Sequence, residues 1–191
     1  MAVGVMSCVP GLVFSISYTT RAPRGSETDG VEYRFVTKAV FERLIQAGEL
    51  LEWALVYGNY YGTSKGFVDE ALAGGRDILF DVDVQGARAI KTKRPEAITV
   101  FIMPPSFRTL RERLERRQLD RHYIIENRLK IACEEVRHYQ DYDYWIINDD
   151  AGKAVDELKA IIVAARCCNE SRAGEARLIL STFGGLDDQN P

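Results

Sequence analysis

The chain has 191 residues and a formal net charge of −3, with 46% hydrophobic and 28% charged residues. This length suits one well-buried domain, and the composition excludes collagen, a coiled coil and a largely disordered chain. The slightly acidic balance argues against a nucleic acid polymer as partner, because such a partner is usually met by a global basic field. A local basic pocket for a small anion is compatible with this balance.

The apolar runs predict neither a membrane span nor a secretory leader. The longest run, 97–103, is far shorter than the roughly 20 residues of a membrane-spanning helix, and the first residues carry no basic leader. The cysteines show no C-x-x-C spacing, which indicates a reduced chain with buried or incidental thiols at Cys8, Cys133, Cys167 and Cys168. We therefore expect a cytoplasmic protein with no membrane partner.

The first half of the chain predicts short strands, turns and two helices. Residues 30–36 alternate apolar and polar side chains, as in a half-buried strand. Thr37 can cap the helix that follows, and Gly48 can end it. The other elements expected here are strands at 13–17 and 50–57, a tight turn at Gly58-Asn59 and a helix at 64–73.

The second half alternates buried strands with helices. Nearly all-apolar runs predict strands at 78–82, 98–103 and 144–147, and helical patterns lie at 85–93, 106–117, 120–139 and 151–166. This alternation predicts a parallel sheet with helices on both faces. Residues 169–191 mix small and polar residues with one apolar island, so we expect a flexible tail.

Two acidic residues, Asp81 and Asp83, lie at the downstream end of the strand expected at 78–82. Ligands of open parallel sheets bind beyond the carboxyl ends of the strands, and an aspartate there can hold the water bound to a nucleotide's magnesium ion. The alternative is that both acids cap the helix that begins near Gln85.

Arg21 and Arg24 lie three residues apart in a loop rich in hydroxyl groups, an arrangement suited to gripping a phosphate dianion. An exposed surface pair is the alternative. Glu52 lies within an apolar strand, where it either reaches solvent or meets a buried edge of hydrogen-bond donors. Aromatic residues on the expected strands favour ordinary packing: Tyr33, Tyr57, Tyr60 and Tyr61.

Seven arginines gather between 108 and 128: Arg108, Arg111, Arg113, Arg116, Arg117, Arg121 and Arg128. They form either a solvated face paired with Glu112, Glu115 and Glu126, or a lid that closes over phosphate groups.

Six motifs in one order carry a specific resemblance: SISYTTRAPR, DGVEYRFV, GELLEWALVYGNYYGT, ILFDVDVQGA, FIMPPS and YWIINDD. From about Pro10 to Ala165 the chain resembles guanylate kinases, which phosphorylate GMP with ATP. The resemblance implies a three-layer α/β fold of the nucleoside-monophosphate-kinase type with a parallel sheet, in one domain over 10–166. Within it, a small GMP-binding β lobe is expected at about 20–75 and a helical lid at about 107–130.

The resemblance also implies roles for individual residues. The GMP phosphate ligands would be Arg21, Arg24, Tyr33 and Tyr61, and the guanine contacts would be Ser17, Glu52, Thr63 and Asp81. Arg117 and Arg128 would neutralise the transferring phosphoryl group as catalytic residues, with Arg113 and Asn148 on the ATP side. Asp83 would act in catalysis by holding Mg²⁺ through water.

One departure from the family pattern concerns the ATP phosphates. Guanylate kinases begin with a strand and a loop of the form GxxxxGK(S/T), and these 191 residues contain no such motif. Because that loop cradles the ATP phosphates and its strand is central in the sheet, we expect both to be missing here, with Ala2–Val9 partly refilling the strand's place. The expected function is guanylate kinase, with activity that this departure puts in doubt. The alternative is a non-catalytic module that binds GMP or a phosphopeptide.

Overall fold

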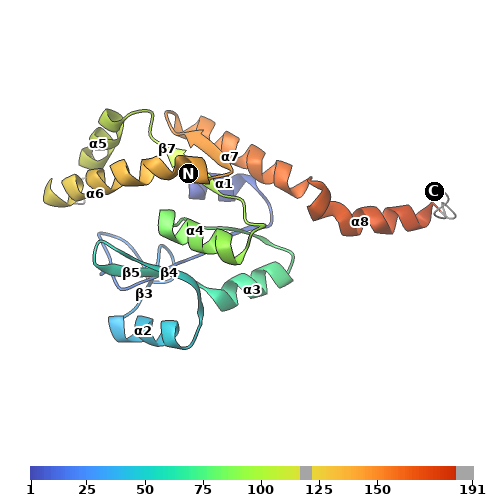
Figure 1. Ribbon diagram of the computed structural model, residues 1–191, viewed down its shortest axis with the longest axis horizontal. Coiled ribbons are helices and arrows are strands. Elements are labelled where there is room, and N and C mark those ends of the chain that lie inside the picture. The colour runs from blue at the N-terminus through green and yellow to red at the C-terminus, as the bar shows by residue number, and fades with distance from the viewer. Residues whose placement is uncertain (117–121, 184–191) are drawn as a thin grey trace.

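Figure 1 shows the computed structural model, which describes residues 1–116 and 122–183. Its strands form three sheets in the described residues: a four-stranded sheet in the lower part of the view, and two parallel pairs in the body above it. We call the four-stranded sheet with its helix α2 the lobe.

The lobe has the strand order β3-β2-β5-β4, from Arg34–Phe35, Tyr18–Thr19, Asn59–Ser64 and Leu50–Val56. β4 and β5 form an antiparallel hairpin in which Val56 pairs with Asn59, so its turn consists of Tyr57 and Gly58. The predicted turn at Gly58-Asn59 is therefore wrong by one residue. Both turn residues have positive φ, 51° and 77°, and this backbone matches the twist of the two strands.

Helix α2 (Lys38–Gln46) begins as the sequence predicts, because the Thr37 hydroxyl accepts a hydrogen bond from the Val40 N–H at 3.3 Å. It packs the fully buried Phe41 against the sheet, where the ring stacks on Tyr60 with centroids 5.1 Å apart. This packing gives the lobe its core.

In the described residues of the body the strands pair in parallel: β1 (Leu12–Phe14) with β6 (Asp77–Leu79), and β7 (Val100–Met103) with β8 (Tyr144–Ile147). Between β6 and β7 lies a cavity of about 390 Å³, lined from both sides by residues that include Leu79, Phe80, Val100 and Phe101. The sheet is thus divided at its middle, where the family resemblance implies a further strand. Ala2–Val9, which we expect to refill this place in part, do so without forming a strand: Val5 and Val9 belong to a buried cluster against which Leu79 of β6 and Val100 of β7 pack.

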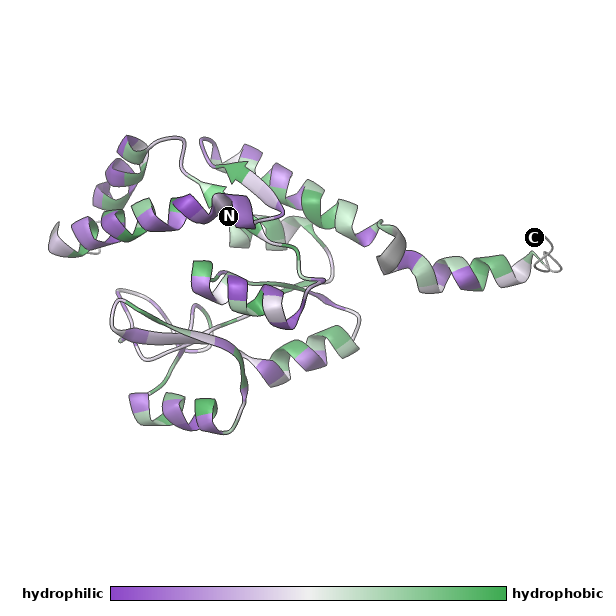
Figure 2. Cartoon of the chain, in the orientation of Figure 1, coloured by the Kyte–Doolittle hydropathy of each residue, from purple (hydrophilic) through white to green (hydrophobic). Residues whose placement is uncertain are grey.

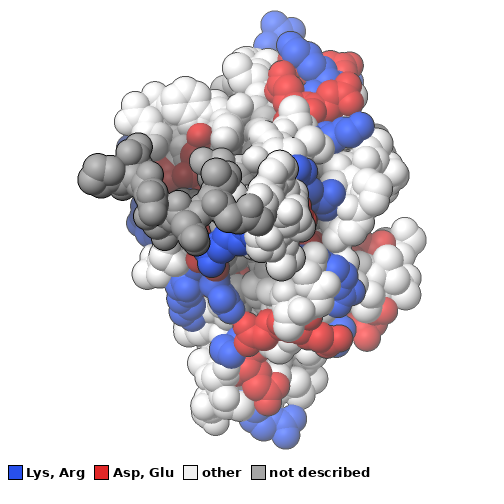
Figure 3. Space-filling view, turned by 90° about the vertical axis from the view of Figure 1, so that its right-hand side faces the viewer, with Lys and Arg blue, Asp and Glu red and all other residues white. Residues whose placement is uncertain are grey.

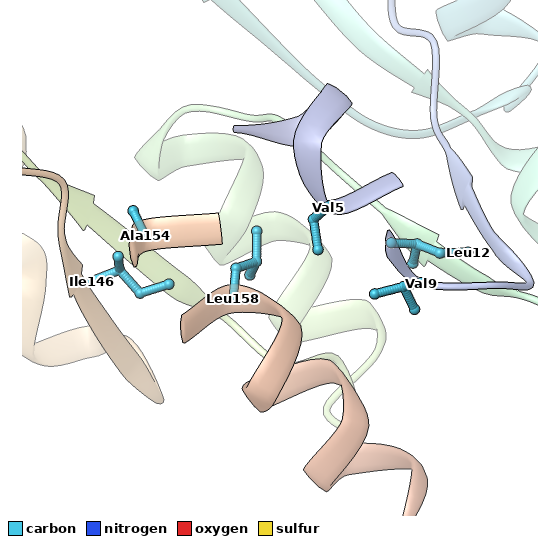
Figure 4. Close-up of a cluster of buried hydrophobic side chains, with 6 residues drawn as sticks. All are labelled: Val5, Val9, Leu12, Ile146, Ala154 and Leu158. Atoms are coloured by element: carbon cyan, nitrogen blue, oxygen red, sulfur yellow. The ribbon is translucent and has the colours of Figure 1, made fainter. Parts of the chain in front are cut away.

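Residues Ala2–Cys8 instead form a helix, α1, that packs on α7 (Ala151–Arg166). Val5 and Val9 lie one helical turn apart and share a buried cluster with Leu158 and Ile146, as Figure 4 shows. A segment with apolar residues at this spacing buries more of them on one neighbouring helix than it would in a strand.

The remaining helices follow the predicted pattern closely: α3 (Lys65–Ala73), α4 (Val84–Lys93), α5 (Phe107–Arg116), α6 (His122–Glu135) and a 3₁₀ helix at Val136–Asp141. Residues Asn169–Thr182, within the tail that we expect to be flexible, form helix α8. α8 projects away from the body in Figure 1, and Figure 2 marks hydrophobic positions along it. Leu178 and Ile179 of this helix are exposed. Local helix propensity, with little packing, suffices to explain it.

Figure 3 shows Lys/Arg and Asp/Glu side chains intermixed on the face that it presents. None of the four cysteines, all within the described residues, forms a disulfide; all four are exposed, so of the two expected alternatives they are incidental rather than buried. Over 1–116 and 122–183, the helices are too short or too polar to cross a membrane.

Candidate active site

A cleft of about 720 Å³ opens between the lobe, the loop after β6 and helix α6. It brings together most of the residues that the sequence singles out: Ser17, Arg21, Arg24, Tyr33, Glu52, Tyr61, Asp81, Asp83 and Arg128. The loop 20–36 and the strands β4 and β5 supply one wall, and the loop after β6 and α6 supply the other. Residues more than 100 positions apart in the sequence therefore face one space.

Arg21 is the most constrained cation of the cleft, with 9% of its side chain exposed. Its Nε donates to the Tyr61 hydroxyl at 3.2 Å, and its guanidinium carbon lies 5.2 Å from the centre of the Tyr33 ring. Nη1 and Nη2 donate to the two carboxylate oxygens of Glu27 at 2.8 and 2.9 Å. These contacts raise the pKa of Arg21, chiefly through Glu27, so the group stays cationic at every pH of interest.

Glu27 is a residue of this site that the sequence reasoning missed. Besides binding Arg21, one of its oxygens accepts the Arg24 backbone N–H at 2.7 Å, so it ties the two arginines of the loop together. Arg21 holds the pKa of Glu27 below its usual range. The available signal was an acid three residues after Arg24. Glu32 is a second acid in the same loop, so the sequence by itself does not show which of the two pairs with the arginines.

Glu52 is the most buried acid of the cleft, with 5% of its surface exposed. Thr63 lies opposite it in the β4–β5 hairpin, and the Thr63 hydroxyl donates to Glu52 Oε1 at 2.6 Å. Burial raises the pKa of Glu52 above its ordinary value, although the Thr63 bond acts in the other direction. The carboxylate thus does not reach bulk solvent, and it lines the cleft instead.

Asp81 and Asp83 lie just after β6, beside the cleft. Asp83 is the N-cap of α4, since its Oδ1 accepts the Gly86 N–H at 2.8 Å. The capping interpretation therefore holds for Asp83, and the residue also lines the cleft. Within residues 1–116 and 122–183, no group of three or more His, Cys, Asp or Glu side chains is arranged to hold a metal directly. The carboxylate oxygens fit the weaker task of binding a cation's water shell.

Helix α6 contributes Arg128 to the cleft, opposite the hairpin turn at Tyr57. Burial raises the pKa of the Tyr57 hydroxyl, and the nearby Arg128 opposes this rise. Two helical turns later, burial and the charge of Asp83 raise the pKa of Glu135. One face of α6 thus carries a cation toward the lobe and an anion toward the strand ends.

The two residues expected on the ATP side also meet, but outside this cleft. Arg113 donates through Nη1 to the Asn148 carbonyl at 2.7 Å and through Nη2 to the Asp149 carbonyl at 3.1 Å. Of the other arginines, Arg108 pairs with Glu112 and Arg111 with Glu126, as the solvated-face interpretation predicts. Arg117 lies outside the described residues.

A family model for guanylate kinase matches residues 10–165. The chain belongs to the guanylate kinase family. A guanylate kinase of Koribacter versatilis (strain Ellin345) is 53% identical over 161 residues, which cover 83% of this chain and 69% of the relative. One of Symbiobacterium thermophilum is 50% identical over 180 residues, covering 94% of this chain and 85% of the relative.

A solved structure supports the family at the level of the fold. The crystal structure of guanylate kinase from Anaplasma phagocytophilum matches with a TM-score of 0.81 and 33% identity, over 95% of this chain and 90% of that one. The expected nucleoside-monophosphate-kinase-like α/β fold is thereby confirmed. The relatives are kinases by name, so they favour the enzyme over the non-catalytic binding module.

Proposed function

We propose that the cleft binds GMP, with guanine at Glu52 and the phosphate at Arg21 and Arg24, and presents that phosphate to ATP. The observation that carries this proposal is Glu52, a nearly fully buried carboxylate that lines a cleft and has one oxygen fixed by Thr63. Burying a carboxylate is costly unless donors meet it. A ligand with two adjacent donors supplies what this position lacks.

Guanine has that donor pair in its ring N–H and its exocyclic amine. Adenine has an acceptor at the matching ring position, so it would place a lone pair against the carboxylate. Thr63 orients Glu52, and Ser17 and Asp81 line the same space for the rest of the base. This arrangement accounts for a preference for GMP over AMP.

The opposite end of the cleft suits a phosphate dianion. Arg21 is held by Glu27 and Tyr61, so its guanidinium is already oriented before a ligand arrives. Arg24 lies in the same loop, and Tyr33 and Tyr61 add hydroxyl donors beside it. Charge-assisted bonds from two guanidinium groups would grip several phosphate oxygens at once.

The ATP side of the proposal involves other residues. Asp83 would hold Mg²⁺ through water, and the ion when bound neutralises phosphate charge. Arg117 and Arg128 would balance charge on the transferring phosphoryl group, and Arg113 and Asn148 would lie toward the adenine. The reaction is an in-line transfer from ATP to GMP, in which positioning and electrostatics do the chemistry. Free nucleotides as substrates and four cysteines without a disulfide bond fit the cytoplasmic location expected from the sequence.

Calorimetry with GMP and AMP tests the base assignment. We expect GMP to bind more tightly, and Glu52→Gln to weaken GMP by about 1–3 kcal/mol because one guanine donor loses its acceptor. AMP binding should change little in the same variant. Equal affinities of the unmutated chain for GMP and AMP would show that Glu52 does not recognise guanine.

Arg24→Lys tests the phosphate assignment separately. Lysine keeps the charge but loses the planar fork that grips two oxygens. We expect weaker GMP binding with unchanged binding of guanosine, which has no phosphate. A parallel loss of guanosine binding would make Arg24 a structural residue.

A further inference from the structure

Gly86 lies buried in the first turn of α4, between two carboxylates of the cleft. A Cβ atom at this position would lie 3.1 Å from Glu52 Oε2, 3.1 Å from Val82 Cβ and 3.2 Å from Asp83 Oδ1. Its backbone is helical, a conformation that alanine adopts more readily than glycine. The glycine therefore has a reason in packing rather than in backbone conformation.

The carboxylates on either side of Gly86 cannot withdraw freely. Glu52 is held at its other oxygen by the buried Thr63, and Asp83 is held by its bond from the Gly86 N–H. A side chain at residue 86 would have to displace the Glu52 carboxylate, the start of α4, or both. The contacts are tight enough to require movement of a few tenths of an ångström.

The same contact places the Glu52 carboxylate beside the start of a helix. Glu52 Oε2 lies against the first turn of α4, a ten-residue helix, where N–H groups without helical partners favour a negative charge. Only a residue without a side chain lets the acid come this close. The start of α4 thus lies beside two carboxylates: that of Asp83, which caps the helix, and that of Glu52.

We propose that Gly86 is a specificity-determining positioning residue, whose missing side chain lets Glu52 take the position from which it selects guanine. The inference rests on the proposed function, because it takes Glu52 to be the group that reads the base. It adds a residue of α4, outside the lobe, to the determinants of base choice.

The test compares Gly86→Ala with Gly66→Ala, using GMP, IMP and AMP as calorimetric probes. Gly66 is a matched control, because it lies in the first turn of α3 and a Cβ there would meet nothing within 4 Å. IMP keeps the ring N–H of guanine and lacks the amine. We expect Gly86→Ala to weaken GMP about tenfold and IMP about threefold, so that the GMP/IMP preference falls. Gly66→Ala should leave all three affinities unchanged.

A double-variant cycle asks whether the effect passes through Glu52. In a Glu52→Gln background, Gly86→Ala should change GMP affinity by less than twofold. If Gly86→Ala does not fold, the comparison moves to Glu52→Asp, whose carboxylate is one methylene shorter and leaves room for the new methyl group. We expect Gly86→Ala to fold in that background and to leave the GMP/IMP ratio of Glu52→Asp as it is.

The outcomes separate this inference from the function beneath it. If the unmutated chain does not prefer GMP, the proposed function fails. If it does, but Gly86→Ala weakens GMP and IMP equally, or adds its full effect to Glu52→Gln, or does not fold even with Glu52→Asp, then Gly86 is a packing residue and the inference is overturned.

Discussion

The strands of the lobe and the strands of the body are paired in different ways. In the lobe, four strands from residues 18–64 form one sheet, and its hairpin keeps close register from Val56–Asn59 to Glu52–Thr63. In the body, two separate parallel pairs flank cavities of about 390 and 770 Å³, and the Ser15 hydroxyl is the described side-chain group that is buried without a partner.

The difference follows from the kind of pairing. Antiparallel strands are joined by tight turns and close within a short stretch of chain, whereas parallel strands need long crossovers and cover on both faces. Glu52, which we propose reads the base, and Arg21 and Arg24, which we propose bind the phosphate, all belong to the lobe. The part of the site that the lobe supplies is therefore built without the strands of the central parallel sheet.

The largest expected effect is the loss of the lobe's core ring. Phe41→Ala removes a fully buried side chain stacked on Tyr60, and we expect it to lower the free energy of unfolding by about 3–5 kcal/mol. GMP binding should be lost with it, because β5 carries Tyr61 and Thr63. Chemical unfolding followed by tryptophan fluorescence measures the change.

The matched change in the body is Leu158→Ala on α7. Leu158 is buried but lines both cavities, so its neighbours already have room to relax, and we expect a cost near the low end, about 2 kcal/mol. Val163→Ala on the same helix is the exposed control, with a change below about 0.5 kcal/mol. A larger loss for Leu158 than for Phe41 would contradict the comparison.

Acid pH should affect the lobe through Glu52, whose pKa is raised by burial. The base-binding form is the carboxylate, so guanosine affinity should fall about tenfold per pH unit once the pH drops below this raised pKa. The effect of acid pH on stability has the opposite sign. Because the folded chain holds the Glu52 proton more tightly than the unfolded chain does, protonation favours folding; this contribution is complete below the ordinary pKa of 4.5 and is lost as the pH rises through the raised pKa of the folded state. Glu52→Gln should therefore be more stable than the unmutated chain at pH 7, with no difference at pH 4.

Glu27 should matter at the other end of the cleft. Glu27→Gln leaves the largely buried Arg21 without its charged partner. We therefore expect this change to lower the free energy of unfolding by about 1–2 kcal/mol at pH 7. The pKa of Glu27 is lowered, so its contribution exists above the ordinary value of 4.5 and disappears as pH falls through the lowered one. Urea unfolding at pH 7 and pH 3 measures both effects, with Glu42→Gln on α2, whose side chain is 46% exposed, as control. A loss that persists unchanged at pH 3 would argue against the ion pair.

The smallest effect is expected at the hairpin turn. Tyr57 has a positive φ of 51°, which asparagine adopts more readily than tyrosine, and Asn-Gly is the favoured pair in such a turn. Tyr57→Asn should raise the free energy of unfolding by about 0.5–1 kcal/mol. A decrease in thermal stability would mean that the ring's contact with the cleft outweighs the backbone strain.

Much of the site could be predicted because its members are close in sequence or carry an unusual local pattern. An acid inside the apolar run 50–57 marks Glu52, and two arginines three residues apart mark the phosphate end. Glu27, Gly86 and Tyr57 were not predicted as site residues. Their roles depend on distances across the fold, such as the 3.1 Å between the position of a Cβ at residue 86 and Glu52, which no pattern of neighbours contains.

By itself the sequence determined the helices with clear caps and stripes, such as α2 and α7, and the hairpin of β4 and β5, because caps, turns and periodicity act within a few residues. Only the tertiary structure decided that Ala2–Cys8 are a helix, that the parallel sheet is divided between β6 and β7, and that α4 begins against Glu52. Those outcomes depend on which distant surfaces are available for packing, and burial against a distant element can override a local preference of a few tenths of a kcal/mol per residue.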